Sequence, residues 1–412
     1  MDVVYPRCCG LDVHKRSVVA CLITPSPTGA PTKEIRTFGT MTAELLALSD
    51  WLTEAGCTQV AMESTGVYWK PVFNLLEENL TLLLVNARHI KAVPGRKTDV
   101  RDCEWIADLL RHGLLKPSFV PDRAQRELRE LTRYRTALVQ ERTAEVNRLQ
   151  KTLEGANIKL AAVATDILGV SGRQILTALV AGTTDSTVLA ELAKGALRRK
   201  IPQLRQALVG RVGAHQRFLI AEHLAHLDFL DERLARVSAE VTECLRPVQA
   251  AIDRLDTIPG IGRYIAEALV AEIGTDMTRF PTAAQLASWA GMCPGNNESA
   301  GKRRSGKTRK GSPWLRALLV QAAHAAARRK DTYLAAQYGR LAARRGKNKA
   351  AIAVGHTILV IAYHLLRREE DYHELGPRYF DEHDRQAVER RLVRRLEALG
   401  NKVTVEPIDP AA

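Results

Sequence analysis

Up to about residue 115 the chain alternates short apolar, often β-branched runs with longer stretches of helical periodicity, and this alternation constrains the fold most. Runs of the first kind are typical of strands, whereas a 3.6-residue apolar period predicts helices. The polar break at residues 14–16 predicts a hairpin between the first two strands. Strands are expected at residues 8–13, 17–24, 34–38, 58–62 and 80–85, and helices at 42–55, 67–79 and from residue 99 onward. The order β-β-β-α-β-α-β-α predicts an α/β domain.

Two acidic residues occupy unusual places in this predicted domain. Asp12 falls inside the first strand, among apolar neighbours where an unpaired charge is costly to bury. Glu63 falls at the carboxyl end of the fourth strand, the side of an open sheet on which sites form. Each has a structural alternative, because Asp12 could begin the following turn and Glu63 could cap the next segment. The same element order occurs in ribonuclease-H-like nucleases, so both acids are candidate site residues.

Asp99 and Asp102 open the next predicted helix. Residues three apart share a helix face, so their carboxylates would lie side by side and repel each other unless a divalent cation holds them. Helix capping is the alternative, since Asp is favoured at a helix start. With Asp12 and Glu63 the pair makes a set of four acids. Such a set could bind one or two Mg²⁺ ions about 4 Å apart, an arrangement that serves phosphodiester chemistry.

The overall charge of the chain indicates a polyanionic partner. Its 412 residues include 60 Lys and Arg against 46 Asp and Glu, giving a formal net charge of +14 and a pI near 9.6. A basic excess of this size favours nucleic acid over a membrane surface. The seven cysteines are scattered without CxxC spacing, which fits a reducing compartment and argues against disulfides and a zinc site. We expect no signal peptide and no membrane span, and hence a soluble, cytoplasmic protein.

The middle of the chain is predicted to be an antiparallel helical insertion. Residues 123–151 and 203–244 are long charged stretches of helical pattern, and they enclose a more apolar, glycine-punctuated segment at 160–200. Such helices bridge domains or pair in coiled-coil fashion, with a solvated surface helix as the alternative. His223 and His226 share a face there but lack an obvious third metal ligand. The predicted divisions are an N-terminal catalytic domain (1–122), a helical linker (123–250), a mainly helical C-terminal domain (251–366) and a charged helical tail (367–412) with a disordered end.

A second centre is predicted in the C-terminal domain. The turn Pro259-Gly260-Ile261-Gly262 precedes an apolar helix, as in helix–hairpin–helix modules, in which backbone N–H groups at Gly260 and Gly262 would meet phosphates; a plain turn is the alternative. In the segment from Trp289 to Gly311, Gly and Pro residues exclude a regular helix and predict a loop. Two serines, Ser299 and Ser305, lie near the basic side chains of this loop, and either hydroxyl could attack a phosphodiester. The basic side chains are Lys302, Arg303, Arg304, Lys307, Arg309 and Lys310.

Taken together these motifs resemble the DEDD-type transposases of the insertion-sequence-110 family, RNA-guided recombinases of bacterial mobile elements. The resemblance covers roughly residues 7–155 and 250–365. It is carried by Gly10-Leu11-Asp12-Val13-His14-Lys15, Met62-Glu63-Ser64-Thr65-Gly66-Val67-Tyr68, Lys97-Thr98-Asp99-Val100-Arg101-Asp102, Ile258-Pro259-Gly260-Ile261-Gly262 and Trp289-Ala290-Gly291-Met292-Cys293-Pro294, followed by Ser299, Gly311 and Leu315-Arg316.

The resemblance implies a fold and a mechanism. The N-terminal domain would be like a Holliday-junction resolvase, with Asp12, Glu63, Asp99 and Asp102 as Mg²⁺ ligands. Alignment of the loops from Pro294 would make Ser299 the nucleophile that forms a covalent 5′-phosphoserine link to DNA. Family members are guided by an RNA that pairs with donor and target DNA. They act as homo-oligomers, dimers or tetramers, in which domains of different subunits complete one active site.

The chain departs from the family pattern at two positions. Ala300 intervenes between the serine and Gly301, and Cys103 stands where a small Ala is usual. Lys97, beside Asp99, is a further candidate nucleic-acid contact. Two other functions stay open: a metal-dependent junction nuclease that uses activated water, and a nucleic-acid-binding protein with a decayed site.

Overall fold

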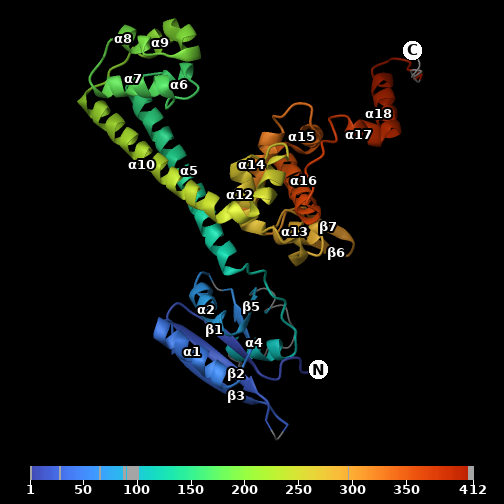
Figure 1. The fold of residues 1–412 in the computed structure, drawn as a ribbon. Coiled ribbons are helices and arrows are strands. Elements are labelled where there is room, and N and C mark those ends of the chain that lie inside the picture. The colour runs from blue at the N-terminus through green and yellow to red at the C-terminus, as the bar shows by residue number, and fades with distance from the viewer. Residues whose placement is uncertain are drawn as a thin grey trace. The chain divides into compact units, whose positions relative to one another are not determined.

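The computed structural model describes residues 2–26, 29–64, 66–86, 90, 102–295 and 297–406, with the backbone alone at residues 297–299, 303 and 304. Lys97, Asp99 and the predicted disordered end at 407–412 therefore lie outside the described residues. The chain divides into two compact units, Met1–Arg123 and Ala124–Ala412 (Figure 1).

The first unit is built on a five-stranded mixed sheet with the order β3-β2-β1-β4-β5. The hairpin β1–β2 and the pair β2–β3 are antiparallel, whereas β4 runs parallel to both β1 and β5. The strands predicted from the sequence are confirmed to within two residues at each end. Their bounds are β1 (Cys8–Val13), β2 (Ser17–Thr24), β3 (Thr32–Gly39), β4 (Gln59–Glu63) and β5 (Thr81–Val85).

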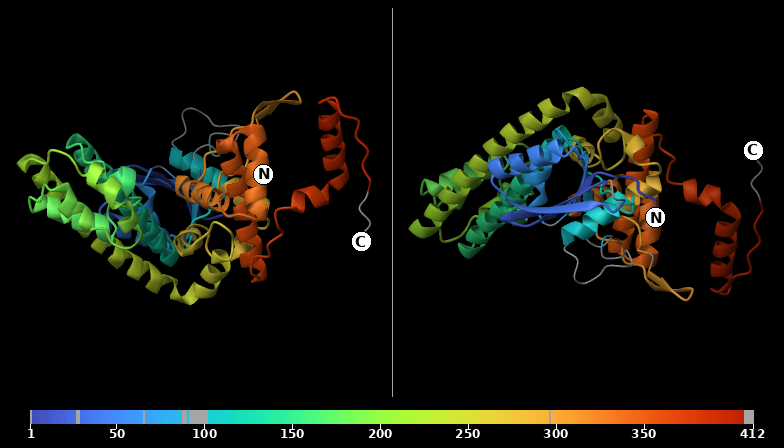
Figure 2. Two further views of the ribbon diagram at one scale, coloured as in Figure 1. Left: turned by 90° about the horizontal axis from the view of Figure 1, so that it is seen from above. Right: turned by 90° about the horizontal axis from the view of Figure 1, so that it is seen from below.

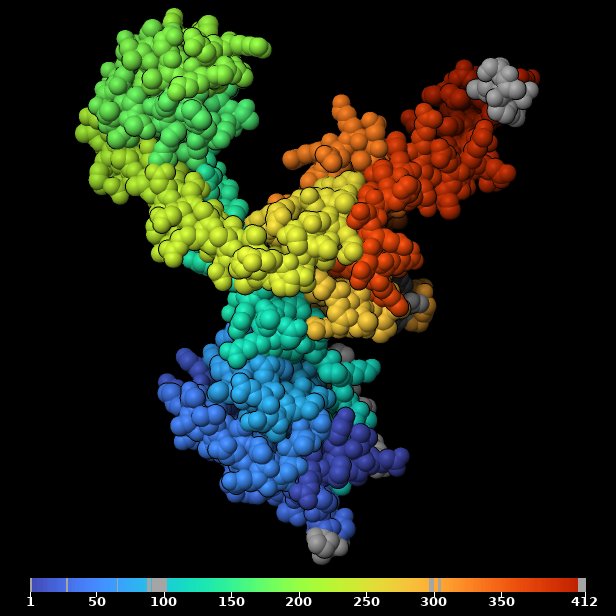
Figure 3. Space-filling model, in the orientation of Figure 1, coloured from blue at the N-terminus to red at the C-terminus, as the bar shows by residue number. Residues whose placement is uncertain are grey.

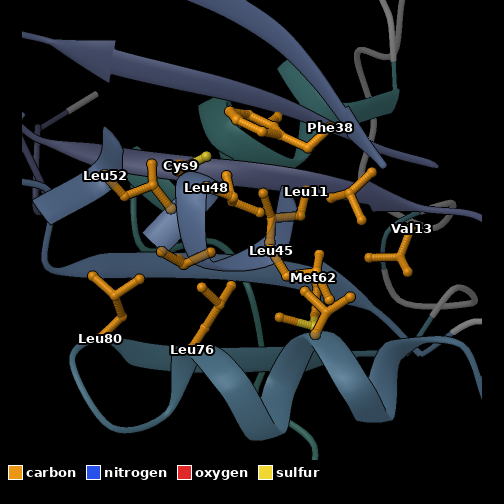
Figure 4. Packing of buried hydrophobic residues seen from close by; sticks show 14 of the residues in the cluster. Cys9, Leu11, Val13, Phe38, Leu45, Leu48, Leu52, Met62, Leu76 and Leu80 are labelled. Carbon is orange, nitrogen blue, oxygen red and sulfur yellow. The ribbon is translucent and has the colours of Figure 1, made fainter. Parts of the chain in front are cut away.

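Each face of this sheet carries its own apolar core, as strand alternation requires. On one face Leu11 and Met62 pack with α1 (Thr42–Glu54) and α2 (Trp69–Leu76), whose buried residues include Leu48 and Leu76 (Figure 4). On the other face the neighbouring strand residues pack against α4 (Asp102–Arg111). The unit is therefore an α/β domain with a helix-covered sheet, as the sequence predicted.

A long helical hairpin begins the second unit. Helices α5 (Arg123–Gly155) and α10 (Ala214–Leu245) lie side by side, and Arg142 Nε lies 2.5 Å from Asp231 Oδ1 (Figure 1). Leu149 and Leu227, one from each helix, belong to a single buried cluster with the short helices between them. The two long helices and the short helices between them thus form one packed body. The short helices are α6 (Leu160–Val163), α7 (Val170–Val180), α8 (Ser186–Glu191), η1 (Gly195–Lys200) and α9 (Ile201–Ala207).

The rest of the second unit is a helical bundle around α16 (Lys347–Arg368), from which the β6–β7 hairpin projects (Figure 2). By length and composition α16 alone among the described helices could cross a membrane, but more than half of its most apolar window is buried, as in a core helix. Around it lie η2 (Arg246–Val248), α11 (Gln249–Asp256), α12 (Arg263–Ile273), η3 (Met277–Arg279), α13 (Ala283–Trp289), β6 (Asn297–Ser299), β7 (Lys302–Ser305), α14 (Pro313–Ala326) and α15 (Tyr333–Arg345).

The tail differs from the helix predicted there. Helix α16 ends at Arg368, the next residue Glu369 adopts a left-handed conformation with φ of 58°, and residues 370–378 form no helix. Helices α17 (Tyr379–His383) and α18 (Arg385–Glu397) follow. Tyr333 of α15 stacks on Phe380, which holds α17 to the bundle. Helix α18 has no buried residue, and the space-filling view shows the red C-terminal segment projecting from the orange part of the unit (Figure 3).

Candidate functional site

Asp12 and Glu63 lie on neighbouring parallel strands at the same edge of the sheet. The register pairs Leu11 of β1 with Met62 of β4, so the next residue of each strand is an acid. Leu11 and Met62 belong to the core beneath α1 and α2, so by alternation both acids face the opposite side, the side of α4. Adjacent strands are only about 4.8 Å apart, which brings the two carboxylates together. Asp12 is a strand residue, so the turn alternative does not hold for it.

Helix α4 brings a third acid to this face because Gly10 lets it approach the strand. A Cβ built on Gly10 would lie 2.3 Å from Cys103 O and 2.4 Å from Ala107 N, both backbone atoms of α4. Only glycine allows the helix to lie so close to β1. Asp102 is the first residue of α4 and directly precedes Cys103. The start of α4 is therefore positioned beside the strand that carries Asp12.

The side chains at this edge are mainly acidic. The Asp12 carboxylate already contacts the His14 ring, with 3.1 Å between Oδ2 and Nε2, and keeps about a quarter (27%) of its side-chain surface exposed. Burial raises the pKa of the Cys103 thiol, and the charges of Glu104 and Asp12 act in the same direction. The donors are all carboxylate oxygens apart from His14, a set that suits Mg²⁺. Within the described ranges, however, no three His, Cys, Asp or Glu side chains come close enough to hold an ion.

In the second unit Ser299 lies at the tip of the β6–β7 hairpin. The register pairs Ser299 with Lys302 across the two-residue turn Ala300-Gly301. Both turn residues have positive φ, 50° at Ala300 and 72° at Gly301, as a type I′ turn requires. The residue that interrupts the family's Ser-Gly pattern thus occupies a left-handed position. The departure is accommodated in a regular hairpin, at a cost in backbone strain.

The base of this serine loop, residues 291–311, is closed by backbone contact. A Cβ on Gly311 would lie 2.2 Å from Ala290 O, and one on Gly291 would lie 2.6 Å from Gly311 N. Arg316 of α14 then holds the loop, because its guanidinium donates to Gly291 O at 2.7 Å and to Thr308 Oγ1 at 2.5 Å. The tip that carries Ser299 therefore stands on a fixed base.

Known protein families match both the part of the chain that carries the acidic edge and the part that carries the serine loop. A family model of DEDD type from the insertion-sequence-110 group, described as a transposase, matches residues 9–158. A second, described as the transposase IS116/IS110/IS902 family, matches residues 252–339. Together they cover more than half of the chain. The chain belongs to the insertion-sequence-110 family of transposases.

Curated relatives of this transposase agree with the family. It is 28% identical over 320 residues to a probable family 20 transposase of Pseudomonas aeruginosa, covering 76% of this chain and 85% of the relative. It is 26% identical over 332 residues to the transposase for insertion sequence element IS1111A of Coxiella burnetii, covering 77% and 80%. An uncharacterized 44.8 kDa protein of insertion element IS116 from Streptomyces clavuligerus is 28% identical over 55% of this chain and 63% of the relative.

The predicted phosphate turn of this transposase has a packing role that the sequence did not reveal. Gly260 has φ of 92°, and a Cβ there would lie 2.5 Å from Ala322 O and Ala326 N of α14. Gly262, by contrast, is exposed and caps the start of α12, and no atom of the described residues lies within 4 Å of a Cβ built there. Gly262 is thus the member of the pair whose surroundings leave room for a phosphate.

The two serines of the loop differ in their surroundings. The Ser305 hydroxyl accepts the Lys307 N–H at 3.2 Å, which gives it a turn-forming role. Ser299 is described in its backbone alone, as are Arg303 and Arg304. The side chains of Lys302, Lys307, Arg309 and Lys310 are exposed, as phosphate contacts would be.

The structural roles of two residues in the family motifs, Gly10 and Arg316, were not predicted from the sequence. Gly10 positions α4, and the available signal was a glycine inside an apolar strand, which suggests close backbone approach. Arg316 organises the serine loop, but no local pattern distinguishes it from other helix-surface arginines. The pair His223 and His226 proves structural, since their Nδ1 atoms lie 2.6 Å and 3.4 Å from the buried Glu145 carboxylate.

Proposed function

We propose that this transposase cuts and exchanges DNA strands with Ser299 as nucleophile and the acids of the first unit as Mg²⁺ ligands. The Ser299 oxygen would attack the scissile phosphorus, forming a 5′-phosphoserine link as the bond to the 3′-oxygen breaks. The serine hydroxyl loses one proton and the 3′-oxygen gains one, so the leaving group is a 3′-hydroxyl. The observation that carries the proposal is that Ser299 stands at a hairpin tip beside Lys302, in a chain of this family.

The acidic half of the proposal assigns Asp12, Glu63, Asp99 and Asp102 to metal binding. Its support is the shared sheet edge of Asp12 and Glu63 and the approach of α4 at Gly10. Bound Mg²⁺ would stabilise charge on the scissile phosphate. The strand order 3-2-1-4-5, with β2 antiparallel to its neighbours, supports a ribonuclease-H-like classification for this unit.

The nucleic-acid contacts are proposed to be spread over both units. Gly262, with the start of α12, would take a backbone phosphate, as in a helix–hairpin–helix module, while Gly260 would hold the turn. The loop cations from Lys302 to Lys310 and Lys97 would contact DNA or RNA phosphates. We also propose a guide RNA, a cytoplasmic location and a homo-oligomer in which the two units of different subunits act on one DNA strand.

Trapping the covalent adduct tests the nucleophile. Purified transposase with Mg²⁺, donor DNA and RNA from the flanking element should yield a protein–DNA adduct that survives denaturation. Ser299→Ala should abolish the adduct while binding is kept, and Ser305→Ala, the matched serine in the same loop, should retain it. Adduct persistence in Ser299→Ala together with its loss in Ser305→Ala would move the nucleophile to Ser305.

The same assay separates the activated-water nuclease from the serine mechanism. A water-based enzyme would cut DNA without any adduct and would tolerate Ser299→Ala, yet lose activity in Asp12→Ala. Guidance is tested separately by sequencing RNA that co-purifies with the protein. The absence of a discrete RNA species would contradict the guide proposal and leave the cleavage proposal standing.

A further inference from the structure

A large cavity lies beside the serine loop, within the second unit. Its volume is about 1240 Å³, it is open to solvent, and it is lined by the loop residues 305–308 and by one face each of α15 and α16. On α15 the lining residues Gln337, Leu341, Arg344 and Arg345 follow the four- and three-residue spacing of one helix face. Small-molecule pockets usually hold about 300–1,000 Å³. The size of this cavity is suited to a segment of a polymer rather than to a small metabolite alone.

The lining of this cavity is strongly basic. Lys307, Arg344, Arg345 and Lys349 reach it from the loop and the α15–α16 corner, and no described lining residue is acidic. These four side chains are exposed and form no ion pair with any residue in the described part of the chain. Elsewhere in the unit arginines are neutralised, as Arg133 is by Glu272, with 2.8 Å between Nε and Oε1. Unpaired cations around a concave surface attract a polyanion.

The floor of the cavity is apolar with a few polar groups. Leu341 and Ile352 supply apolar surface. Gln337 Nε2 donates to Thr357 Oγ1 at 2.9 Å, and its buried Oε1 has no hydrogen-bond partner in the described part of the chain. Burial lowers the pKa of His356, so its ring is neutral at pH 7 and can both donate and accept. Such a floor suits a flat heterocycle that carries hydrogen-bonding edges.

We propose that this cavity binds an unpaired nucleotide of the nucleic acid held by the serine loop. The base would lie on Leu341 and Ile352, with its donor groups toward Gln337 after a small turn of that side chain. The flanking phosphates would contact Arg344, Arg345 and Lys349. Because Ser305 and Lys307 belong both to the cavity and to the loop that carries Ser299, the nucleotide would be held near the strand that is cut. The inference rests on the proposed function, since it takes nucleic acid as the polyanion.

Two variants separate the contribution of the base to binding from that of the phosphates. Ala353→Trp fills the cavity without changing charge, and Arg344→Gln/Arg345→Gln removes two cations and leaves the floor intact. The matched control is Arg328→Gln/Arg329→Gln, which removes two exposed arginines outside the cavity. Binding of the full chain is measured by fluorescence anisotropy with labelled probes of about 12 nucleotides, a usual site size. The probes are single-stranded DNA, single-stranded RNA, an abasic DNA strand and a DNA duplex.

Ala353→Trp should weaken binding of base-bearing single strands about fivefold, the lower end of the range for losing one stacked base, because Leu341 and Ile352 are aliphatic. It should leave the abasic strand and the duplex unchanged. Arg344→Gln/Arg345→Gln should weaken single-strand binding roughly tenfold at 0.15 M salt and flatten the slope of log K against log salt by about 1.4, because each single-strand phosphate contact contributes about 0.7. Loss confined to RNA or to DNA would identify the source of the nucleotide.

Three results would count against the proposal. Equal binding by both cavity variants and the control would overturn the inference and leave the proposed strand cleavage intact. An equal loss for duplex and single strand in Ala353→Trp would also overturn it, because a duplex keeps its bases paired. Failure of the unaltered protein to bind any probe would overturn the proposed function together with the inference.

Discussion

Gly10→Ala tests whether the approach of α4 to β1 is what assembles the acidic edge. The new methyl carbon would lie 2.3–2.4 Å from two backbone atoms of α4, whereas ordinary contacts begin at 3.4 Å. The helix must therefore move by about 1 Å, the difference between 3.4 Å and 2.4 Å. No smaller side chain on α4 can relieve this contact, because the obstructing atoms belong to its backbone. Overpacking of this kind costs about 1–3 kcal/mol in the free energy of unfolding.

The same displacement carries the start of α4, and Asp102 with it, away from Asp12. Misplacement of a reacting group by about 1 Å lowers catalysis roughly a hundredfold. Urea unfolding should thus show a lower midpoint with an unchanged slope, and DNA cleavage should fall about a hundredfold at temperatures where the variant stays folded. Gly39→Ala is the control, because its Cβ would meet only the Glu44 side chain, at 3.2 Å. Full activity in a destabilised Gly10→Ala protein would refute the link between this contact and the site.

Three other substitutions test the interactions described above. Ala300→Gly should relieve about 1–2 kcal/mol of left-handed backbone strain, partly offset by the greater conformational freedom of glycine when the loop is unfolded. Amide hydrogen exchange in the hairpin should therefore slow, and faster exchange would contradict the left-handed turn at Ala300. Arg135→Met should lower the free energy of unfolding in urea by about 1.5–3 kcal/mol, because it breaks the buried pair with Glu267 (2.6 Å) but leaves that carboxylate paired with Arg263 (2.9 Å). Unchanged stability would exclude the Arg135–Glu267 pair. Glu145→Gln should lower stability at pH 7. Burial acts to raise the pKa of Glu145, but hydrogen bonds from His223 and Arg148 lower it overall. The stability difference from wild type should therefore be full above pH 4.5 and shrink as pH falls from 4.5 through the lowered pKa; a difference that does not shrink below pH 4.5 would refute this.

Much of the first unit could be predicted because its signals are local. Apolar, β-branched runs predicted the strands, and these placed Asp12 within the first strand and Glu63 at the end of the fourth. The contact between Gly10 and α4 could not be predicted, because it joins segments far apart in sequence and depends on which sheet face the helix covers. Asp99 remains a prediction, since it lies outside the described residues.

The serine loop was harder to predict for a different reason. A run of basic residues has no apolar alternation, so the β6–β7 pairing left no periodic signal. The turn at Ala300-Gly301 is also unusual, because only the second residue is a common left-handed type. In the tail the interruption had a visible cause, since Gly376-Pro377 disfavours a continuous helix, but the density of charges on both sides suggested one.

The structure also changes what the positive net charge means. Two arginines of α5 are not free to bind nucleic acid, because buried acids of α12 neutralise them: Arg135 pairs with Glu267, and Arg133 pairs with Glu272. The formal net charge of +14 therefore does not show where the chain can bind a polyanion, because it counts paired and unpaired cations alike. Four cations without an ion partner among the described residues, Lys307, Arg344, Arg345 and Lys349, line one cavity between the serine loop and the α15–α16 corner. Since counterion release depends on local charge density, this corner rather than the long helices should govern the salt dependence of nucleic-acid binding.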